Sequence, residues 1–477
     1  MSWKGSPRAL LLIVGILMAV ALLPTISGCT GGVPSSLDKV LKAIGSHDRL
    51  PAEAARELTR FADVYHQYSS APDNEGKLEY FDFAFKRLRA SYVHPVSDSE
   101  LIDAAIKGVT AKQSGPGSVA PGTLVENALN AMVASLDPHS AYLNAEQFRE
   151  SFVHTKGEFG GLGIEVTMED GLVRVVAPIE DTPAFRAGMK SGDLITHVDG
   201  EAIKGKTLLE AVRLMRGRPG TVILLRVRRA GLPDFDVTIT RVIIKVRAVK
   251  WRTEGKVGYI RVTRFSERLE IGIEEAFAAI HGELGRNLRG IVLDLRNNSG
   301  GLLDQSLILA DAFLDAGEIV SVRGRLPQNH QSYAAAEGDL AKGAQMVVLI
   351  NEGSASASEI VASALKYYRR ATVLGSRSFG KGSVQTVIPL GHRQGAIRLT
   401  TARYYTPSGQ SIQVHGIEPD IVFTRVNPPQ REKDLQNSLS AEGKAGKTYG
   451  LLMDVVCPDV GGHEDPVLLC ALDVLRN

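Results

Sequence analysis

Residues 346–368 read MVVLINEGSASASEIVASALKYY, and this stretch decides the fold of the C-terminal half of the chain. It starts as a short apolar run typical of a buried strand and continues as a helix from Ser356 to Tyr368. A serine at a helix N-terminus lies beside unpaired backbone N–H groups and the positive end of the helix dipole, where an oxyanion is stabilised. Ser356 is therefore a candidate nucleophile.

The same residues also fit a purely structural role. Ser356 and Glu359 have the spacing of a capping box, and Ser354 has the position of a plain N-cap. Caps of this kind are common, so this segment alone leaves both interpretations open.

Alternating strand and helix patterns surround the segment. Strand-like runs at 256–262 and 290–295 flank a helix of about 15 residues that starts at Ser266. A helix from Leu302 to Ala316 follows, and a strand at 372–375 comes after the Ser356 helix. This alternation predicts an α/β layer with some parallel strands over residues 244–426.

The flanking regions differ from this layer. Residues 38–155 are expected to be helical, because apolar residues recur at helical spacing in 78–88 and 124–133. Residues 157–242 read as glycine-punctuated strands with short helices at 182–188 and 208–216, and residues 427–477 as a tail with two short helices, the last at 466–475. The predicted fold class is therefore a multidomain α/β and α+β protein.

The N-terminus is expected to be a targeting signal. Lys4 and Arg8 precede an apolar run of 15 residues, and small residues then lead to Cys29. Residues 1–28 thus resemble a lipoprotein signal peptide with Cys29 as the lipidated residue. Ordinary cleavage nearby and an uncleaved anchor are the alternatives, and each of them exports the protein.

Composition narrows the class of protein. The chain has 477 residues, 44% of them apolar and 23% charged, which is typical of a soluble globular protein of about three or four domains. Its formal charge of +2 falls to zero without residues 1–28, so we expect no nucleic-acid partner. In an exported protein Cys457 and Cys470 are candidates for a disulfide, the alternative being two buried thiols. No metal site is predicted at this spacing.

A second candidate segment is Gly380-Lys381-Gly382. It nearly matches a phosphate loop, but the required Ser or Thr is replaced by Gly382 and a strand follows, so we expect no nucleotide. A Ser356 nucleophile needs a base, and neither a Gly-x-Ser-x-Gly elbow nor a histidine in a distinctive context is present. A buried lysine with a lowered pKa can replace histidine. The alternative for Lys381 is a solvated loop lysine.

The order and spacing of seven runs resolve these alternatives. Residues 78–426 resemble the carboxyl-terminal processing peptidases, or tail-specific proteases, in 136–143 LDPHSAYL, 157–164 GEFGGLGI, 294–302 DLRNNSGGL, 353–359 GSASASE, 380–385 GKGSVQ, 401–409 TARYYTPSG and 416–420 GIEPD. The resemblance implies a serine endopeptidase with an α/β core at 244–426, Ser356 as nucleophile, Lys381 as base and Gln385 as the residue that orients the lysine. On a regular strand, positions 381 and 385 point to the same face.

The resemblance also implies an oxyanion hole. The Ala357 N–H is one donor, and Gly300 or Gly301 is the other. The family usually has proline where this chain has Ser299, which makes the loop less rigid but keeps both glycines.

The unit at 157–242 resembles a PDZ domain. Its loop residues Gly161, Leu162, Gly163 and Ile164 match the motif that binds a peptide's C-terminal carboxylate, although Ile164 could simply pack in the core. Expected partners are proteins or peptides with apolar C-termini, and no cofactor is expected. A homo-oligomer or an activator protein is left open. We expect the periplasmic side of a bacterial cell envelope, and the competing hypothesis is a non-catalytic envelope scaffold that binds C-terminal peptides.

Overall fold

The computed structural model describes residues 50–111, 115–179, 181–391, 395–423, 430–442 and 465–476. Its contacts divide the chain into two units, Met1–Ala55 and Arg56–Asn477, and every sheet of the described residues belongs to the second unit. The expected signal peptide, Cys29 and Cys457 lie outside the described residues. Among the described residues, no helix has both the length and the apolar content needed to cross a membrane.

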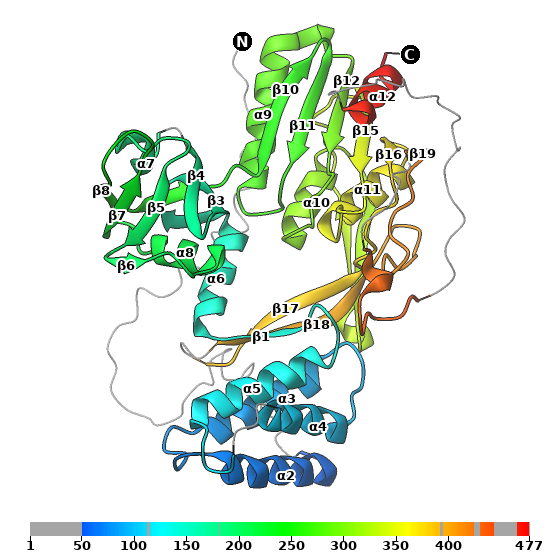
Figure 1. The fold of residues 1–477 in the computed structure, drawn as a ribbon. Coiled ribbons are helices and arrows are strands. Elements are labelled where there is room, and N and C mark those ends of the chain that lie inside the picture. The colour runs from blue at the N-terminus through cyan, green and yellow to red at the C-terminus, as the bar shows by residue number, and fades with distance from the viewer. Residues whose placement is uncertain are drawn as a thin grey trace, which may run out of the picture. The chain divides into compact units, whose positions relative to one another are not determined.

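The described region that precedes the β unit is mainly helical, as predicted. It contains α2 (Ala52–Tyr68), α3 (Lys77–Ser91), α4 (Asp98–Thr110), α5 (Pro121–Ala134) and α6 (Ala145–Lys156) (Figure 1). Apolar residues of α3, α4 and α5, such as Leu88, Leu101 and Leu129, are fully buried or nearly so. One strand, β1 (Ala141–Leu143), interrupts the helices and pairs with a strand more than 250 residues later, so the expectation of helix throughout was wrong there. Three residues are too few for a strand pattern to show in the sequence.

The glycine-punctuated region forms a compact β unit. Its strands are β2 (Glu158–Gly161), β3 (Ile164–Glu169), β4 (Leu172–Pro178), β5 (Leu194–Val198), β6 (Glu201–Ala202), β7 (Val222–Arg228), β8 (Phe235–Thr240) and β9 (Val242–Lys245). Helices α7 (Pro183–Arg186) and α8 (Leu208–Met215) pack with a sheet of order β3-β4-β5-β7-β8, in which β6 pairs with β5. Strands β2 and β9 pair antiparallel where the chain enters and leaves the unit.

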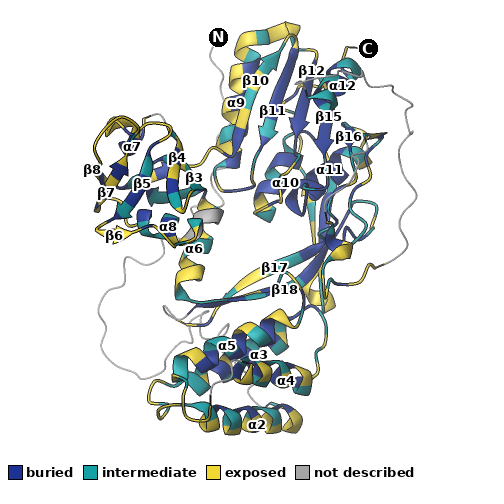
Figure 2. Cartoon of the chain, viewed as in Figure 1, coloured by how far each residue is buried: buried dark blue, intermediate teal, exposed yellow. Residues whose placement is uncertain are grey.

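The α/β layer is a six-stranded sheet of order β10-β11-β12-β15-β16-β19. Its strands are β10 (Val249–Glu254), β11 (Val257–Val262), β12 (Gly290–Asp294), β15 (Gln345–Ile350), β16 (Thr372–Gly375) and β19 (Ile421–Val422). All pairs are parallel except β10–β11, which confirms the predicted parallel layer. The central strand β12 is buried over its whole length, as Figure 2 shows.

Helices cover both faces of this sheet. One face packs against α9 (Leu269–Leu284), α10 (Leu303–Asp311) and α11 (Ala357–Tyr367). The other face packs against α12 (Pro466–Val474), whose buried Leu468 and Leu472 close a second apolar cluster. The predicted helix 302–316 was too long at its C-terminal end: α10 stops at Asp311, and β13 begins at Gly317. The tail therefore completes the sheet's core through its last helix.

A second sheet is antiparallel and carries the lysine segment. It contains β1, β13 (Gly317–Gly324), β14 (Gln331–Ala335), β17 (Ser383–Pro389) and β18 (Ala396–Tyr405). Strands β17 and β18 form a long antiparallel hairpin, labelled in Figure 1. Short 3₁₀ turns lie at η2 (Gly285–Asn287), η3 (Pro327–Asn329) and η4 (Glu432–Asp434).

Candidate active site

Ser356 lies in the turn between β15 and α11, directly before the first residue of the helix. Its backbone has φ 55° and ψ −112°, in the positive-φ region that non-glycine residues rarely occupy. Such a conformation costs about 1–3 kcal/mol and persists only where surrounding contacts impose it. The side chain is buried, and its hydroxyl makes no capping hydrogen bond. The turn thus presents a serine hydroxyl directly before Ala357, the first residue of the helix.

The two capping interpretations have different outcomes. The prediction that Ser354 is the N-cap was wrong, because Ser356 holds that position and the Ser354 hydroxyl instead donates to the Leu295 carbonyl at 2.8 Å and accepts from the Asn351 N–H at 3.0 Å. The capping-box arrangement of Ser356 and Glu359 is present: the Glu359 carboxylate accepts from the Ser356 N–H at 2.7 Å, and the Ser356 side chain faces the Glu359 backbone nitrogen. The Glu359 N–H donates to the Ser356 backbone carbonyl at 2.8 Å, and the Ser356 hydroxyl makes no capping hydrogen bond. The hydroxyl of Ser356 is therefore not held in a hydrogen bond to the first turn of the helix.

The glycine loop at 294–302 is fixed against the serine turn. The Asn298 carbonyl accepts from the Ala355 N–H at 3.0 Å and from the Ser358 hydroxyl at 2.8 Å. A Cβ on Gly300 would lie 3.0 Å from Ser356 Cβ and 3.1 Å from the Ala357 nitrogen. Only glycine lets the loop approach the nucleophile turn this closely, which brings the predicted residues Ser356, Ala357 and Gly300 together.

The two glycines have different backbone surroundings. The Gly300 N–H donates to the Asn298 side-chain oxygen at 3.0 Å, so it already has an acceptor. The Gly300 carbonyl accepts from the Phe265 N–H at 3.2 Å. Because C=O and N–H of a trans peptide point in opposite directions, the Gly301 N–H points away from Phe265. The Gly300 N–H is thus engaged within the loop, whereas the Gly301 N–H is directed away from Phe265.

A buried carboxylate joins the serine turn to the lysine loop. One oxygen of Glu359 accepts from the N–H groups of Ser356 at 2.7 Å and Lys381 at 3.0 Å. Its other oxygen accepts from the Gly380 N–H at 2.7 Å and the Ser378 hydroxyl at 2.6 Å. The backbone nitrogens of Ser356 and Lys381 thus lie within about two hydrogen-bond lengths of each other.

Burial raises the pKa of Glu359 to about 7, against the opposing effect of its four donors. The capping-box spacing in the sequence predicted only a local capping role for Glu359. Its bonds to the lysine loop have no sequence signal.

Lys381 is partly buried and precedes β17. Burial lowers the pKa of its ammonium group, and the nearby Arg398 lowers it further, while the carboxylates of Glu432, Glu359 and Asp137 oppose the shift. These surroundings contradict the alternative of a freely solvated loop lysine. They favour the neutral amine, which is the form that can accept a proton.

Gln385 follows Lys381 by four residues, but the two do not lie on one regular strand. Strand β17 begins at Ser383, after Lys381, and its pairing shifts at a bulge between Val384 and Gln385. The argument that 381 and 385 share a strand face was therefore wrong. The Gln385 amide nitrogen donates to the Ser383 hydroxyl at 2.9 Å and to Thr400 Oγ1 at 3.2 Å.

The motif at 136–143 supports the site from the helical region. Asp137 is buried, and its carboxylate accepts from the hydroxyls of Thr400 at 3.0 Å and Ser140 at 2.7 Å. Thr400 in turn holds Gln385, so a chain of hydrogen bonds runs from Asp137 to a predicted site residue. In the sequence, Asp137 stands out only as part of a family resemblance. Its partner Thr400 lies 263 residues away, which no local pattern reveals.

Two family models and several known proteins match this chain. A model of peptidase family S41 matches residues 256–423, and a PDZ-domain model matches residues 174–229. The chain is 55% identical over 354 residues to a carboxy-terminal-processing protease of Bartonella bacilliformis, covering 74% of this chain and 76% of that protein. The chain belongs to the carboxy-terminal-processing protease family. The predicted family, fold class and serine-type peptidase activity are thereby confirmed.

Other relatives are more distant. A probable CtpA-like serine protease of Staphylococcus aureus is 38% identical over 304 residues, covering 63% of this chain and 60% of that protein. Among solved structures, the photosystem II D1 C-terminal processing protease is 28% identical, with a TM-score of 0.46, covering 73% of this chain and 93% of that one.

In this carboxy-terminal-processing protease, the predicted peptide loop of the PDZ domain lies between β2 and β3. Gly161 ends β2, Gly163 has φ 81°, and Leu162 is buried in the core of the domain. Ile164 is partly buried and packs against the same core, as the structural alternative predicted. The Leu162 and Gly163 carbonyls are held by the Ala184 N–H and the Thr182 hydroxyl, both at 3.0 Å. The loop is thus fixed by the start of α7.

The remaining candidate residues concern stability and metals. Cys470 is buried in α12 and is disulfide-bonded. Its predicted partner Cys457 lies outside the described residues, so that pairing stays a prediction. Within the described ranges, no group of three or more His, Cys, Asp or Glu side chains could hold a metal ion.

Proposed function

We propose that this chain is an endopeptidase that cleaves by acyl-enzyme chemistry, with Ser356 as nucleophile and neutral Lys381 as general base. The observation that supports this most strongly is the Glu359 carboxylate, which binds the backbone of both residues and sets their loops side by side. The strained Ser356 turn and the burial of Lys381 are what a serine nucleophile and an amine base require.

The steps follow from these roles. Lys381 Nζ takes the hydroxyl proton as Ser356 Oγ bonds to the carbonyl carbon of the scissile peptide. The tetrahedral intermediate collapses, its C–N bond breaks, and the Lys381 ammonium returns the proton to the leaving amine. Water then attacks the ester, again giving a proton to Lys381, and Ser356 leaves with that proton restored.

The oxyanion would be held by two backbone donors. The Ala357 N–H is in the first turn of α11, and the Gly301 N–H points away from Phe265. We assign the second donor to Gly301 rather than Gly300, because the Gly300 N–H already donates to Asn298. Losing one such donor typically costs about 10²–10³ in rate.

Gln385 would orient the base. Its amide nitrogen is engaged by Ser383 and Thr400, which leaves its oxygen as the atom that can accept from Lys381. The bulge in β17 sets this side chain, and Asp137 keeps Thr400 in place.

The PDZ domain would select substrates by their C-terminal tails. In this mode the tail adds as a strand along β3 while N–H groups of the loop 161–164 bind its carboxylate, and an apolar side chain enters the adjoining pocket. The positive φ of Gly163 and the bonds that fix the loop carbonyls support such a preformed carboxylate site.

The test compares cleavage of an unstructured protein that ends in apolar residues by the parent enzyme and by Ser356→Ala and Lys381→Ala. We expect no turnover by either variant. The matched control is Ser363→Ala, also on α11, whose hydroxyl donates to the Ile360 carbonyl one turn before it. Retained cleavage by both site variants would refute the assignment. Charged residues at the substrate's C-terminus should raise KM if the PDZ domain reads the tail.

We also propose export to the periplasmic side of a bacterial envelope, with Cys29 as a lipid anchor. The support is the basic N-terminus, the apolar run and the small residues before Cys29. Intact-mass measurement of the protein purified from membranes tests this. A diacylglycerol-modified N-terminal Cys29 is expected, and a water-soluble protein cleaved elsewhere would refute it. The same preparation shows by its mass in solution whether the enzyme forms a homo-oligomer.

A further inference from the structure

A segment beyond the matched peptidase region packs on the lysine loop. Residues 430–442, called here the C-terminal strap, begin seven positions after the end of the S41 match. The Arg431 Nε donates to the Ser378 carbonyl at 2.9 Å, and the Glu432 N–H donates to the Phe379 carbonyl at 3.2 Å. The strap is thus bonded to the residues shortly before Lys381.

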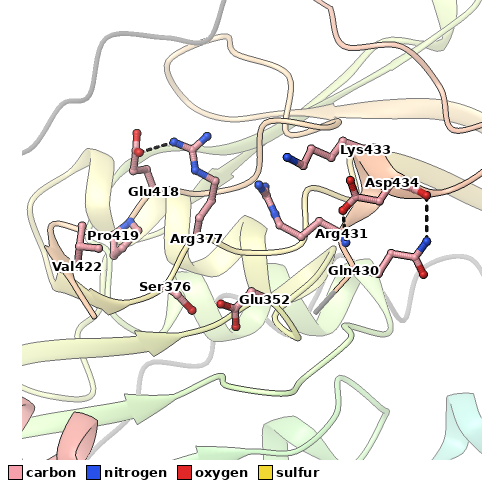
Figure 3. Close-up of a pocket in the computed structure, with 10 residues that line it drawn as sticks. All are labelled: Glu352, Ser376, Arg377, Glu418, Pro419, Val422, Gln430, Arg431, Lys433 and Asp434. Atoms are coloured by element: carbon pink, nitrogen blue, oxygen red, sulfur yellow. Dashed lines mark hydrogen bonds and ion pairs between the residues drawn. The ribbon is translucent and has the colours of Figure 1, made fainter. Parts of the chain in front are cut away.

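The first turn of the strap has two distinct sides. Gln430, Arg431, Lys433 and Asp434 line a surface pocket of about 400 Å³, where their side chains are visible in Figure 3. Glu432 lies between them in sequence but does not line that pocket, and its side chain is fully buried. One carboxylate in this turn therefore points into the protein.

Both oxygens of the Glu432 carboxylate have partners. One accepts from the Gln413 amide nitrogen at 2.7 Å, and the other lies 2.7 Å from His139 Nε2. The Gln413 side-chain oxygen accepts from the Gly382 N–H at 2.9 Å. A continuous path of three hydrogen bonds therefore joins His139 and Glu432 to the residue next to Lys381.

Glu432 also acts on Lys381 through its charge. Four charged side chains face the lysine: Arg398 from β18, Glu432 from the strap, Glu359 from α11 and Asp137 from the 136–143 motif. The carboxylates favour the protonated lysine, and Arg398 favours the neutral one. Because the Glu432 carboxylate is fully buried, solvent screens its charge little, and the charge therefore acts on the Lys381 amine.

We propose that Glu432 is a positioning residue of the peptidase site, which fixes the Lys381 loop through Gln413 and is itself held by His139. This inference rests on the proposed Ser356–Lys381 chemistry. It makes the strap part of the active site, although the strap lies outside the peptidase-family match.

Two variants test the charge and the mechanical link separately. Glu432→Gln keeps the size of the side chain and removes its charge, so the rise of kcat/KM with pH should move to lower pH. Gln413→Leu keeps the volume and breaks the link to Gly382, so kcat should fall by up to about 10²-fold while KM changes little. Lys433→Gln, which removes a charge one residue away on the pocket side, should leave the profile unchanged.

The experiment uses full-length enzyme with the unstructured substrate, with thermal unfolding measured for each variant. A shifted profile in Glu432→Gln and a reduced kcat in folded Gln413→Leu would support the proposal, because a purely structural role moves neither the profile nor kcat alone. An unchanged profile, or a parent-like kcat in Gln413→Leu, would overturn it. If Glu432→Gln does not fold, Gln413→Leu decides alone. Cleavage by Ser356→Ala would instead overturn the proposed function, and this inference with it.

Discussion

Replacing Glu359 with glutamine perturbs the contact that joins the two catalytic loops. The buried carboxylate accepts four hydrogen bonds, two at each oxygen. A glutamine amide keeps one oxygen for Ser356 and Lys381, and its nitrogen can donate to the Ser378 hydroxyl. The Gly380 N–H and the Ser378 hydroxyl hydrogen then lose their acceptor, and each buried unsatisfied donor costs about 1–3 kcal/mol.

Glu359→Ala removes both acceptor oxygens and leaves all four donors without a partner, so we expect a loss of at least about 4 kcal/mol in the free energy of unfolding. Urea unfolding measures the loss in the free energy of unfolding for Glu359→Gln and for Glu359→Ala, each in a Ser356→Ala background that prevents self-cleavage. Glu352→Gln is the matched control: this carboxylate is also buried and lies four residues before Ser356 in the chain, but one of its oxygens has no hydrogen-bond partner within the described structure. It should cost less than about 1 kcal/mol. Equal stability of Glu359→Gln and Glu359→Ala, or no loss in either, would refute this reasoning.

Three further outcomes are expected. Activity should rise with pH through an apparent pKa below the 10.5 of free lysine, because burial lowers the pKa of Lys381 and only the neutral amine accepts the proton. Initial rates measured across pH test this, and a rise centred at or above pH 10.5 would contradict it. Gly301→Ala should lower kcat by about 10²–10³-fold, because the added Cβ would lie 2.0 Å from the Phe265 carbonyl oxygen and must displace the loop that carries the oxyanion donor. A parent-like kcat in steady-state kinetics would count against the oxyanion assignment. Arg296→Ala should destabilise the enzyme by about 3–5 kcal/mol in urea, because it strips the fully buried Asp294 of its ion pair; a loss below about 1 kcal/mol would be inconsistent with that pair.

The sequence predicted those parts of the fold in which local pattern and burial agree. Strands β12 and β15 are short apolar runs, and α11 begins where the serine turn indicates, because burial on both faces of a parallel sheet leaves a strong signal. Strand β1 was missed, since three residues carry no period, and α10 ended early although apolar residues continue to Leu314.

For the site, the residue types were predictable and their connections were not. Ser356 and Lys381 were found from a turn and a resemblance. The carboxylate that joins them, Glu359, looked like a local cap because its second role depends on a loop 21 residues away. The His139–Glu432 contact spans 293 residues. Such pairings follow from the folded arrangement of distant segments, which no window of sequence contains.

The most direct test of the central claim is covalent labelling with a fluorophosphonate, which forms a phosphonate ester at an activated serine with loss of fluoride. Intact-mass and peptide-mapping analysis should find one adduct, on Ser356. No adduct should form in Ser356→Ala, and labelling should be slow in Lys381→Ala, where the base is missing. An adduct on a different residue, in an enzyme whose Ser356→Ala variant still cleaves substrate, would contradict the assignment of Ser356 and Lys381 as the catalytic pair.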